Sequence, residues 1–164
     1  MLDLALIGGR IVDERGVPVG RALVGARGPR DTSVGRSNER GRFALGIIAS
    51  EPVRVLARKP GYVIGIEGGV EPGTLDVVMV LRRGGSVSGR VIGDPLPARF
   101  DLRVLRWERH GRVPASMASV HRREGGCFSV TRLPSGVYEI AAGRDSVVVD
   151  VDAGESVDGV ELRL

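Results

Sequence analysis

Short runs of alternating apolar and polar residues recur along the whole chain. In residues 159–164, for example, Val160, Leu162 and Leu164 share one face. Gly and Pro interrupt these runs, and no segment longer than about ten residues keeps a helical period. Many short strands separated by turns predict an all-β sandwich or barrel. The runs rich in Val, Ile and Leu are residues 4–12, 21–26, 53–58, 75–81, 87–92, 100–107, 128–131, 137–142 and 147–151.

The chain also repeats itself. Residues 9–12 (Gly-Arg-Ile-Val) match residues 89–92 (Gly-Arg-Val-Ile), and residues 41–43 (Gly-Arg-Phe) match residues 126–128 (Gly-Cys-Phe). The offset drifts from 80 to 85 residues, as expected where turns change length and strands do not. We therefore expect two copies of one unit, residues 1–82 and 84–164, joined by a linker too short to be flexible.

Alternation predicts which side chains form the core of each unit. Each unit should hold about seven strands in roughly 80 residues, near the lower limit for a single core. A polar residue in place of Phe43 or Phe128 is expected to unfold its unit. The expected inward set is Ile11, Val24, Phe43, Leu45, Val53, Val55, Val77 and Met79 in the first unit, and Val91, Phe100, Leu102, Val104, Phe128, Val130, Tyr138, Ile140, Val160 and Leu162 in the second.

The repeated motifs resemble the carboxypeptidase regulatory-like domain family. The first copy carries them in residues 9–24, 37–43 and 59–62 (Lys-Pro-Gly-Tyr), and the second in residues 89–91, 126–128 and 133–138. The resemblance covers nearly the whole chain and implies two tandem transthyretin-like (prealbumin-like, Ig-like Greek-key) β-sandwiches. It also implies a non-catalytic accessory module, often one of several in exported or surface proteins. The second copy departs by a shortened first turn and lacks a clear Gly-Tyr pair.

Composition narrows the class of protein further. The chain has 164 residues, of which 42% are hydrophobic, and its one Cys excludes a disulfide framework within the chain. There is no apolar run of about 18 residues, so no transmembrane segment is expected. The first residues carry Asp3 and no basic region, so we expect no signal peptide here. The family resemblance favours an extracytoplasmic location within a larger exported protein, and the compartment stays open.

Charge is unevenly distributed over the second unit. Residues 99–123 hold seven Arg and two acids, whereas residues 145–164 hold six acids and one Arg. One interpretation is a basic face for a polyanion such as nucleic acid. The other is that the two stretches are neighbouring strands whose charges face each other and water. A net charge of only +4 favours the second interpretation, so we do not expect a nucleic-acid partner.

Two basic loops, residues 106–115 and 122–126, hold the candidate binding residues. Trp107 is the only Trp, and beside Arg side chains it could stack on a sugar or anchor a protein partner. The competing and favoured interpretation is that it covers the junction between the two sandwiches. The candidate binding residues are Trp107, Arg106, Arg109, His110, Arg122 and Arg123.

Few residues in the sequence suggest a metal site, a reactive thiol or a catalytic site. His121 and Cys127 flank a predicted hairpin turn and His110 could join them, but structural zinc usually needs four ligands. Residues 150–155 lack the spacing of a calcium loop. Cys127 could form an intermolecular disulfide. No nucleophile–base set or phosphate loop is present, so we expect no enzyme, no cofactor and no metal.

These observations predict a non-catalytic structural or protein-interaction module. Its tandem sandwiches would present loops and strand edges to a protein partner or to an assembly of its own copies. One alternative is a carbohydrate-binding accessory domain of a larger exported protein, which would use Trp107. The other alternative is polyanion binding through residues 99–123.

Overall fold

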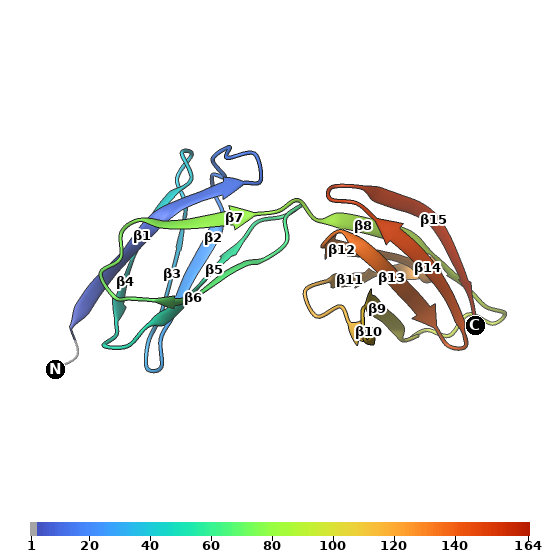
Figure 1. Cartoon of the computed structure of the whole chain (residues 1–164). Coiled ribbons are helices and arrows are strands. Elements are labelled where there is room, and N and C mark those ends of the chain that lie inside the picture. Colours follow the sequence, from blue (N-terminus) through green and yellow to red (C-terminus); the bar gives the residue numbers. More distant parts are fainter. Residues whose placement is uncertain (1–2) are drawn as a thin grey trace. The chain divides into compact units, whose positions relative to one another are not determined.

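The computed structural model describes residues 3–164, and the chain divides into two compact units, Met1–Arg82 (unit 1) and Arg83–Leu164 (unit 2) (Figure 1). The described residues form fifteen strands and one short 3-10 turn, η1 (Glu124–Gly126). None of them belongs to a helix that is long and apolar enough to cross a membrane. Each unit consists of two sheets around one core, which confirms the predicted all-β sandwich class.

Unit 1 is a seven-stranded sandwich. One sheet has the order β4-β1-β7, in which β1 (Leu4–Asp13) pairs antiparallel with β4 (Arg42–Ile48) and parallel with β7 (Val77–Leu81). The other is antiparallel with the order β3-β2-β5-β6, and comprises β2 (Leu23–Arg27), β3 (Thr32–Arg36), β5 (Val53–Arg58) and β6 (Gly65–Val70). All eight side chains expected in the unit 1 core are buried.

Unit 2 repeats this plan with one strand more. Its first sheet, β11-β12-β8-β15, comprises β8 (Gly85–Ile92), β11 (Ser119–Arg122), β12 (Cys127–Leu133) and β15 (Ser156–Arg163). Its second, β10-β9-β13-β14, comprises β9 (Leu102–Glu108), β10 (Gly111–Pro114), β13 (Gly136–Ala142) and β14 (Asp145–Val151). The extra strand arises because residues 111–122 pair first with β9 and then, as β11, with β12.

The unit 2 core is close to the predicted one. Eight of the ten expected side chains are buried, while Phe100 and Val104 are half-buried and pack against the core cluster. Phe100 precedes β9, which begins at Leu102, so strand alternation does not fix the direction of its side chain.

The repeated sequence motifs occupy the same register in both units. In each, the Gly of the Gly-Arg motif pairs with the repeated Phe on one side and with a Val of the parallel strand on the other. A Cβ atom on either Gly would overlap the carbonyl oxygen of that Val, so the close approach requires glycine. The three partners are Gly9, Phe43 and Val77 in unit 1 and Gly89, Phe128 and Val160 in unit 2.

Candidate functional site

The outward side of the β4-β1-β7 sheet in unit 1 is apolar. Its large side chains are 43% to 73% exposed, and small residues (Gly8, Ala44 and Gly46) lie between them. Leu75 belongs to the same surface, because a Cβ on the outward-facing Gly8 would contact its side chain at 3.4 Å. We call this surface the unit 1 outer face; its large members are Leu4, Leu6, Ile48, Leu75, Val78 and Val80.

The same side of the equivalent sheet in unit 2 is polar. Outward positions of β8 and β12 carry hydroxyl side chains, and Ser88 donates a hydrogen bond to Asp158 over 2.6 Å. Ser86 and Ser156 share another hydrogen bond at 2.9 Å. Two copies of one fold thus expose opposite chemistry on the same sheet, so the fold itself does not need the apolar side chains of unit 1.

The two units also differ at the strand edge next to this face. In unit 2, β11 pairs with β12 so that His121 lies opposite Ser129 and Ser119 opposite Thr131. Ser129 and Thr131 of β12 correspond to Ala44 and Gly46 of β4 in unit 1, and β4 is an edge strand of its sheet. Among residues 3–164, no strand pairs with β4 on that side. We call the outward backbone groups of Ala44 and Gly46 the β4 edge.

Side chains close both ends of the β4 edge. The Asn38 Oδ1 accepts a hydrogen bond from the Arg42 amide over 2.9 Å, and the Asn38 amide donates to the Arg42 carbonyl over 2.8 Å. The Asp31 carboxylate accepts from the Ile48 amide over 2.8 Å. Since hydrogen-bonding direction alternates along a strand, these bonds show that residues 42, 44, 46 and 48 direct their backbone groups away from β1. Of these four residues, Arg42 has both outward groups engaged and Ile48 has its amide engaged, so only Ala44 and Gly46 offer both an amide and a carbonyl to a further strand.

Trp107 lies on the outward side of the second sheet of unit 2. It is 48% exposed, and it pairs across the strands with Arg112, whose guanidinium carbon lies 5.6 Å from the centre of the indole ring. Arg112 also forms a salt bridge of 2.6 Å with Glu139, which is nearly buried. The indole, the guanidinium and the carboxylate therefore form a cluster. The sequence predicted Trp107 as a binding residue, but neither Arg112 nor Glu139.

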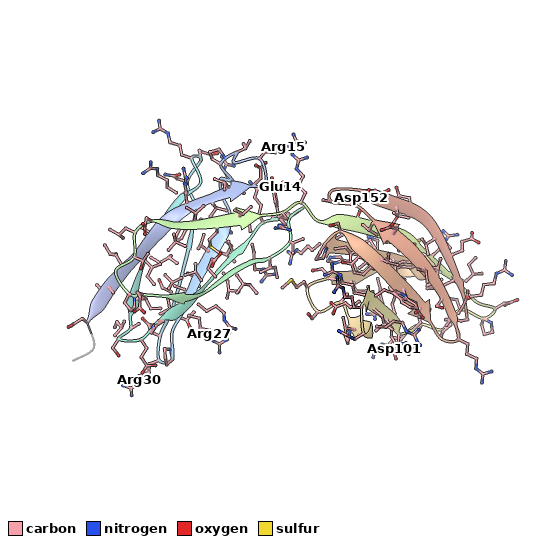
Figure 2. All side chains as sticks on the ribbon, viewed as in Figure 1. Glu14, Arg15, Arg27, Arg30, Asp101 and Asp152 are labelled. Atoms are coloured by element: carbon pink, nitrogen blue, oxygen red, sulfur yellow. The ribbon has the colours of Figure 1, made fainter. Side chains whose placement is uncertain are left out.

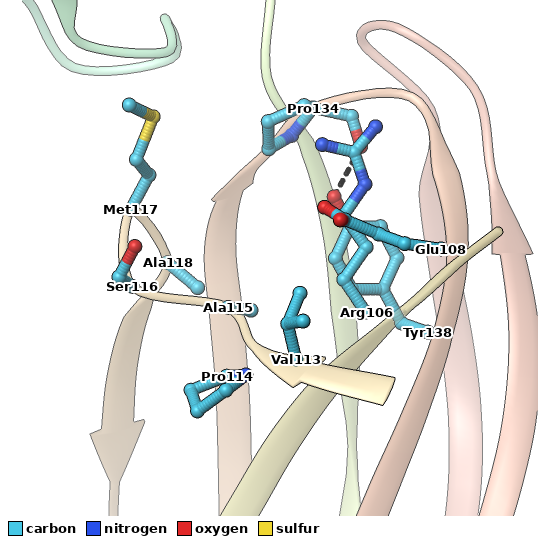
Figure 3. A pocket seen from close by; sticks show the side chains of 10 residues that line it. All are labelled: Arg106, Glu108, Val113, Pro114, Ala115, Ser116, Met117, Ala118, Pro134 and Tyr138. Carbon is cyan, nitrogen blue, oxygen red and sulfur yellow. Dashed lines mark hydrogen bonds between the residues drawn. The ribbon is translucent and has the colours of Figure 1, made fainter. Parts of the chain in front are cut away.

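Arg106 precedes Trp107 on β9, so its side chain lies on the opposite face of the sheet, where it lines a cavity of about 370 Å³ in unit 2 (Figure 3). Its guanidinium donates to the Ser135 carbonyl over 3.1 Å. Tyr138 lines the cavity beside Arg106, and its hydroxyl donates to the Pro134 carbonyl over 2.6 Å, while Met117 lies on the opposite side. Burial raises the pKa of the Tyr138 hydroxyl, and the nearby charge of Arg106 opposes that rise.

The predicted binding residues do not form one site. Arg109 and His110 lie in the turn that follows β9, beyond Arg106 and Trp107. Arg122 and Arg123 instead line a hollow with residues 98–101, which precede β9; Asp101 is labelled in Figure 2. The seven residues of β9 separate the two groups by roughly 23 Å. Acidic Asp101 and Glu124 line the second hollow together with its arginines.

Cys127 is half-buried at the start of β12, and its Sγ accepts a long contact of 3.9 Å from Arg90. His121 pairs with Ser129 rather than with Cys127. In the part of the chain that the structure describes, no three His, Cys, Asp or Glu side chains are grouped as metal ligands would be. The intermolecular disulfide through Cys127 stays a prediction.

No protein-family model matches the chain, and no curated protein gives a significant match. Several solved structures resemble it. The Bacillus anthracis TIE protein has a TM-score of 0.39 at 13% identity, over 98% of this chain and 34% of that chain. A Streptococcal ancillary pilin has 0.43 at 13% identity, over 98% and 62%. The shaft pilin SpaA from Lactobacillus rhamnosus GG has 0.36 at 9% identity, over 98% of both.

The chain therefore spans only 34% and 62% of the first two proteins that it resembles. Identities of 9% to 13% give no basis for transferring a function from them. The class that the strands and their pairing define is an all-β protein of two repeated sandwiches. Membership of the carboxypeptidase regulatory-like family stays a prediction.

Proposed function

We propose that this chain is a non-catalytic structural module that binds a protein partner through the β4 edge. The observation that carries the proposal is the contrast between the units, since β11 covers in unit 2 the edge that β4 leaves open in unit 1. Proteins usually protect such edges with charged residues, Pro or bulges. Between Arg42 and Ile48 the sequence of β4 is Phe-Ala-Leu-Gly-Ile, which has none of these.

The partner would contribute a short extended segment antiparallel to β4. Ala44 and Gly46 each offer one amide and one carbonyl, so the added segment gains up to four main-chain hydrogen bonds. Their side chains are small, and β3 lies near β4 without pairing with it, so the added segment would enter between these two strands. Asn38 and Asp31 occupy the flanking groups and limit the slot to a few residues, comparable with the four residues of β11.

Hydrogen exchange on the full chain tests this proposal. The probe is a synthetic peptide of residues 118–123 (Ala-Ser-Val-His-Arg-Arg), which spans the strand covering the same edge in unit 2. We expect saturating peptide to slow exchange of the Ala44 and Gly46 amides at least about tenfold. The Ala44→Pro variant should bind the peptide more weakly, because Pro removes an outward amide that β1 does not use. A peptide with Pro in place of its His is the control, because residues 119, 121 and 123 direct their backbone groups toward β12, as the hydrogen bond from the Arg123 amide to the Cys127 carbonyl shows.

The proposal fails if millimolar peptide leaves the exchange of both amides unchanged. It also fails if the Ala44→Pro variant and the wild type bind the peptide equally well.

Carbohydrate binding at the Trp107 cluster is the second candidate function. The observation that favours it is an indole 48% exposed on an open sheet face beside charged groups of both signs. Aromatic rings stack on sugar rings, and Arg112 and Glu139 could hydrogen-bond the hydroxyl groups. Retention on immobilised glycans, compared between the wild type and a Trp107→Ala variant, tests this candidate.

A further inference from the structure

The unit 1 outer face is too apolar to be explained by exposure of single hydrophobic residues. It holds six of the large hydrophobic side chains that are exposed in the described chain, all on or beside one three-stranded sheet. The largest apolar patch of an ordinary monomer covers about 300–600 Å² and is often functional. With strands about 4.8 Å apart and about 3.3 Å per residue, the ten, seven and five residues of β1, β4 and β7 present a face of roughly 350 Å².

Charges lie at the two ends of the unit 1 outer face and differ in sign. Arg10 and Arg42 are directly opposite each other at one end, although like charges in that position repel. Neither forms a salt bridge within the described residues. At the other end, Asp3 precedes Leu4, and Asp31 lies beside the β4 edge, where its carboxylate accepts hydrogen bonds from the Thr32 and Ile48 amides and keeps its negative charge. The six-residue step from Leu4 to Arg10 separates the two ends by about 20 Å.

We infer that the unit 1 outer face is covered by the same face of a second copy of this chain. A two-fold axis near Ile7, halfway between Leu4 and Arg10, would bring the arginine end of each copy over the acidic end of the other. The apolar middle would then face its own copy, as in a sandwich of two sheets packed about 10 Å apart. Ala44 and Gly46 leave room beside Leu6 for side chains of the facing sheet.

Self-association fits the face better than a different partner does, because the face is complementary to itself under that rotation in both charge and hydrophobicity. The face is smaller than the roughly 800 Å² per partner that specific interfaces usually bury, so the dimer should be weak and concentration-dependent. Pairing of the β4 edge with its own copy would leave the face uncovered. The inference therefore concerns a surface other than the β4 edge, and it can fail while the proposed function stands.

Sedimentation velocity on the full chain, from low micromolar to millimolar concentration, tests the inference. We expect a concentration-dependent dimer that high salt weakens. Leu6→Lys should raise its dissociation constant at least about tenfold, because a charge would be buried without a partner. Leu6 is 54% exposed, so the variant should still fold, which a thermal melt checks. The matched control is Val148→Lys, since Val148 is 55% exposed on an outward position of unit 2.

Three results would overturn the inference. The first is a wild-type monomer over the whole range, and the second is a dimer that Leu6→Lys leaves unchanged. The third is a dimer that Ala44→Pro abolishes and Leu6→Lys does not, which would place the contact at the β4 edge. Arg42→Glu adds a check on orientation, because it should weaken the dimer at low salt and have less effect at high salt.

Discussion

The repeated glycines offer the sharpest test of how the two sandwiches are built. In Gly9→Ala, the new Cβ would overlap the Val77 carbonyl oxygen and lie 2.7 Å from the carbonyl carbon and 2.9 Å from the Cα. Gly89→Ala would produce the same conflict with Val160, and its Cβ would also lie 2.9 Å from the Phe128 ring. In both units the obstructing atoms are backbone of the parallel strand and cannot rotate away.

The expected loss in the free energy of unfolding follows from these distances. Carbon atoms in contact normally lie about 3.5–4.0 Å apart, so the parallel strands must separate by about 1 Å. Overpacking of this kind costs about 1–3 kcal/mol, and we expect the upper end because the displaced strand also loses part of its hydrogen-bond ladder. An 82-residue unit has a free energy of unfolding of about 4–12 kcal/mol, so either variant should lose a large share of it.

Urea denaturation measures this loss in each unit. Trp107 is the only Trp and belongs to unit 2, so its fluorescence should report the shift caused by Gly89→Ala. Far-UV circular dichroism follows both units and should report the shift in Gly9→Ala. Gly68→Ala is the matched control: it has open space around its Cβ, so it should be neutral or slightly stabilising. Midpoints for Gly9→Ala and Gly89→Ala that match the control would refute the reasoning.

Other predictions concern single side chains. Ser37→Ala should cost unit 1 about 2–4 kcal/mol in urea denaturation, because the buried hydroxyl bonds the Val19 carbonyl at 2.9 Å and the Ala22 amide at 3.0 Å; a neutral result would contradict this. Since the folded state raises the Tyr138 pKa, unit 2 should lose stability as pH rises above about 10. Tyr138→Phe should remove that pH dependence in thermal melts, and an unchanged pH profile would refute the assignment. Trp107→Ala should abolish glycan retention while leaving the melting temperature nearly unchanged; equal retention would exclude the glycan candidate.

Alternation was sufficient to predict the core because only one side of each sheet is buried. Residues such as Phe43, Val55, Ile140 and Leu162 follow a period of two, and all of them are buried. The repeat was equally visible in sequence, since its motifs contain Gly and Phe at positions where few other residues fit. These features depend on local geometry, which the sequence encodes directly.

The division of residues 111–122 between two sheets was not predictable in the same way. β10 and β11 are short and largely exposed, so their sequences carry little periodic signal. Each pairs with the strand next to it in the chain, β10 with β9 and β11 with β12, and no periodic signal in residues 111–122 shows where the first pairing ends and the second begins. The grouping of Trp107 with Arg112 and Glu139 depends on the same pairing and was missed for the same reason.

The unit 1 outer face did have a signal in the sequence. Residues 4–7 (Leu-Ala-Leu-Ile) and residues 77–81 (Val-Val-Met-Val-Leu) are continuous apolar runs rather than alternating ones. Such runs are typical of strands that avoid water on both sides of a sheet. The inward residues of these runs, such as Ile7 and Met79, belong to the core, and their outward neighbours are equally apolar.

Unit 2 provides an internal control for the meaning of those outward residues. Its equivalent sheet folds around the same register with Ser, Thr and charged residues facing outward. Leu6 and Val80 therefore contribute little that the sandwich requires, and in water they only raise the risk of aggregation. An apolar surface that raises the risk of aggregation and does not stabilise the isolated unit is expected where another protein surface covers it. The opposite charges at its two ends favour a second copy as the cover.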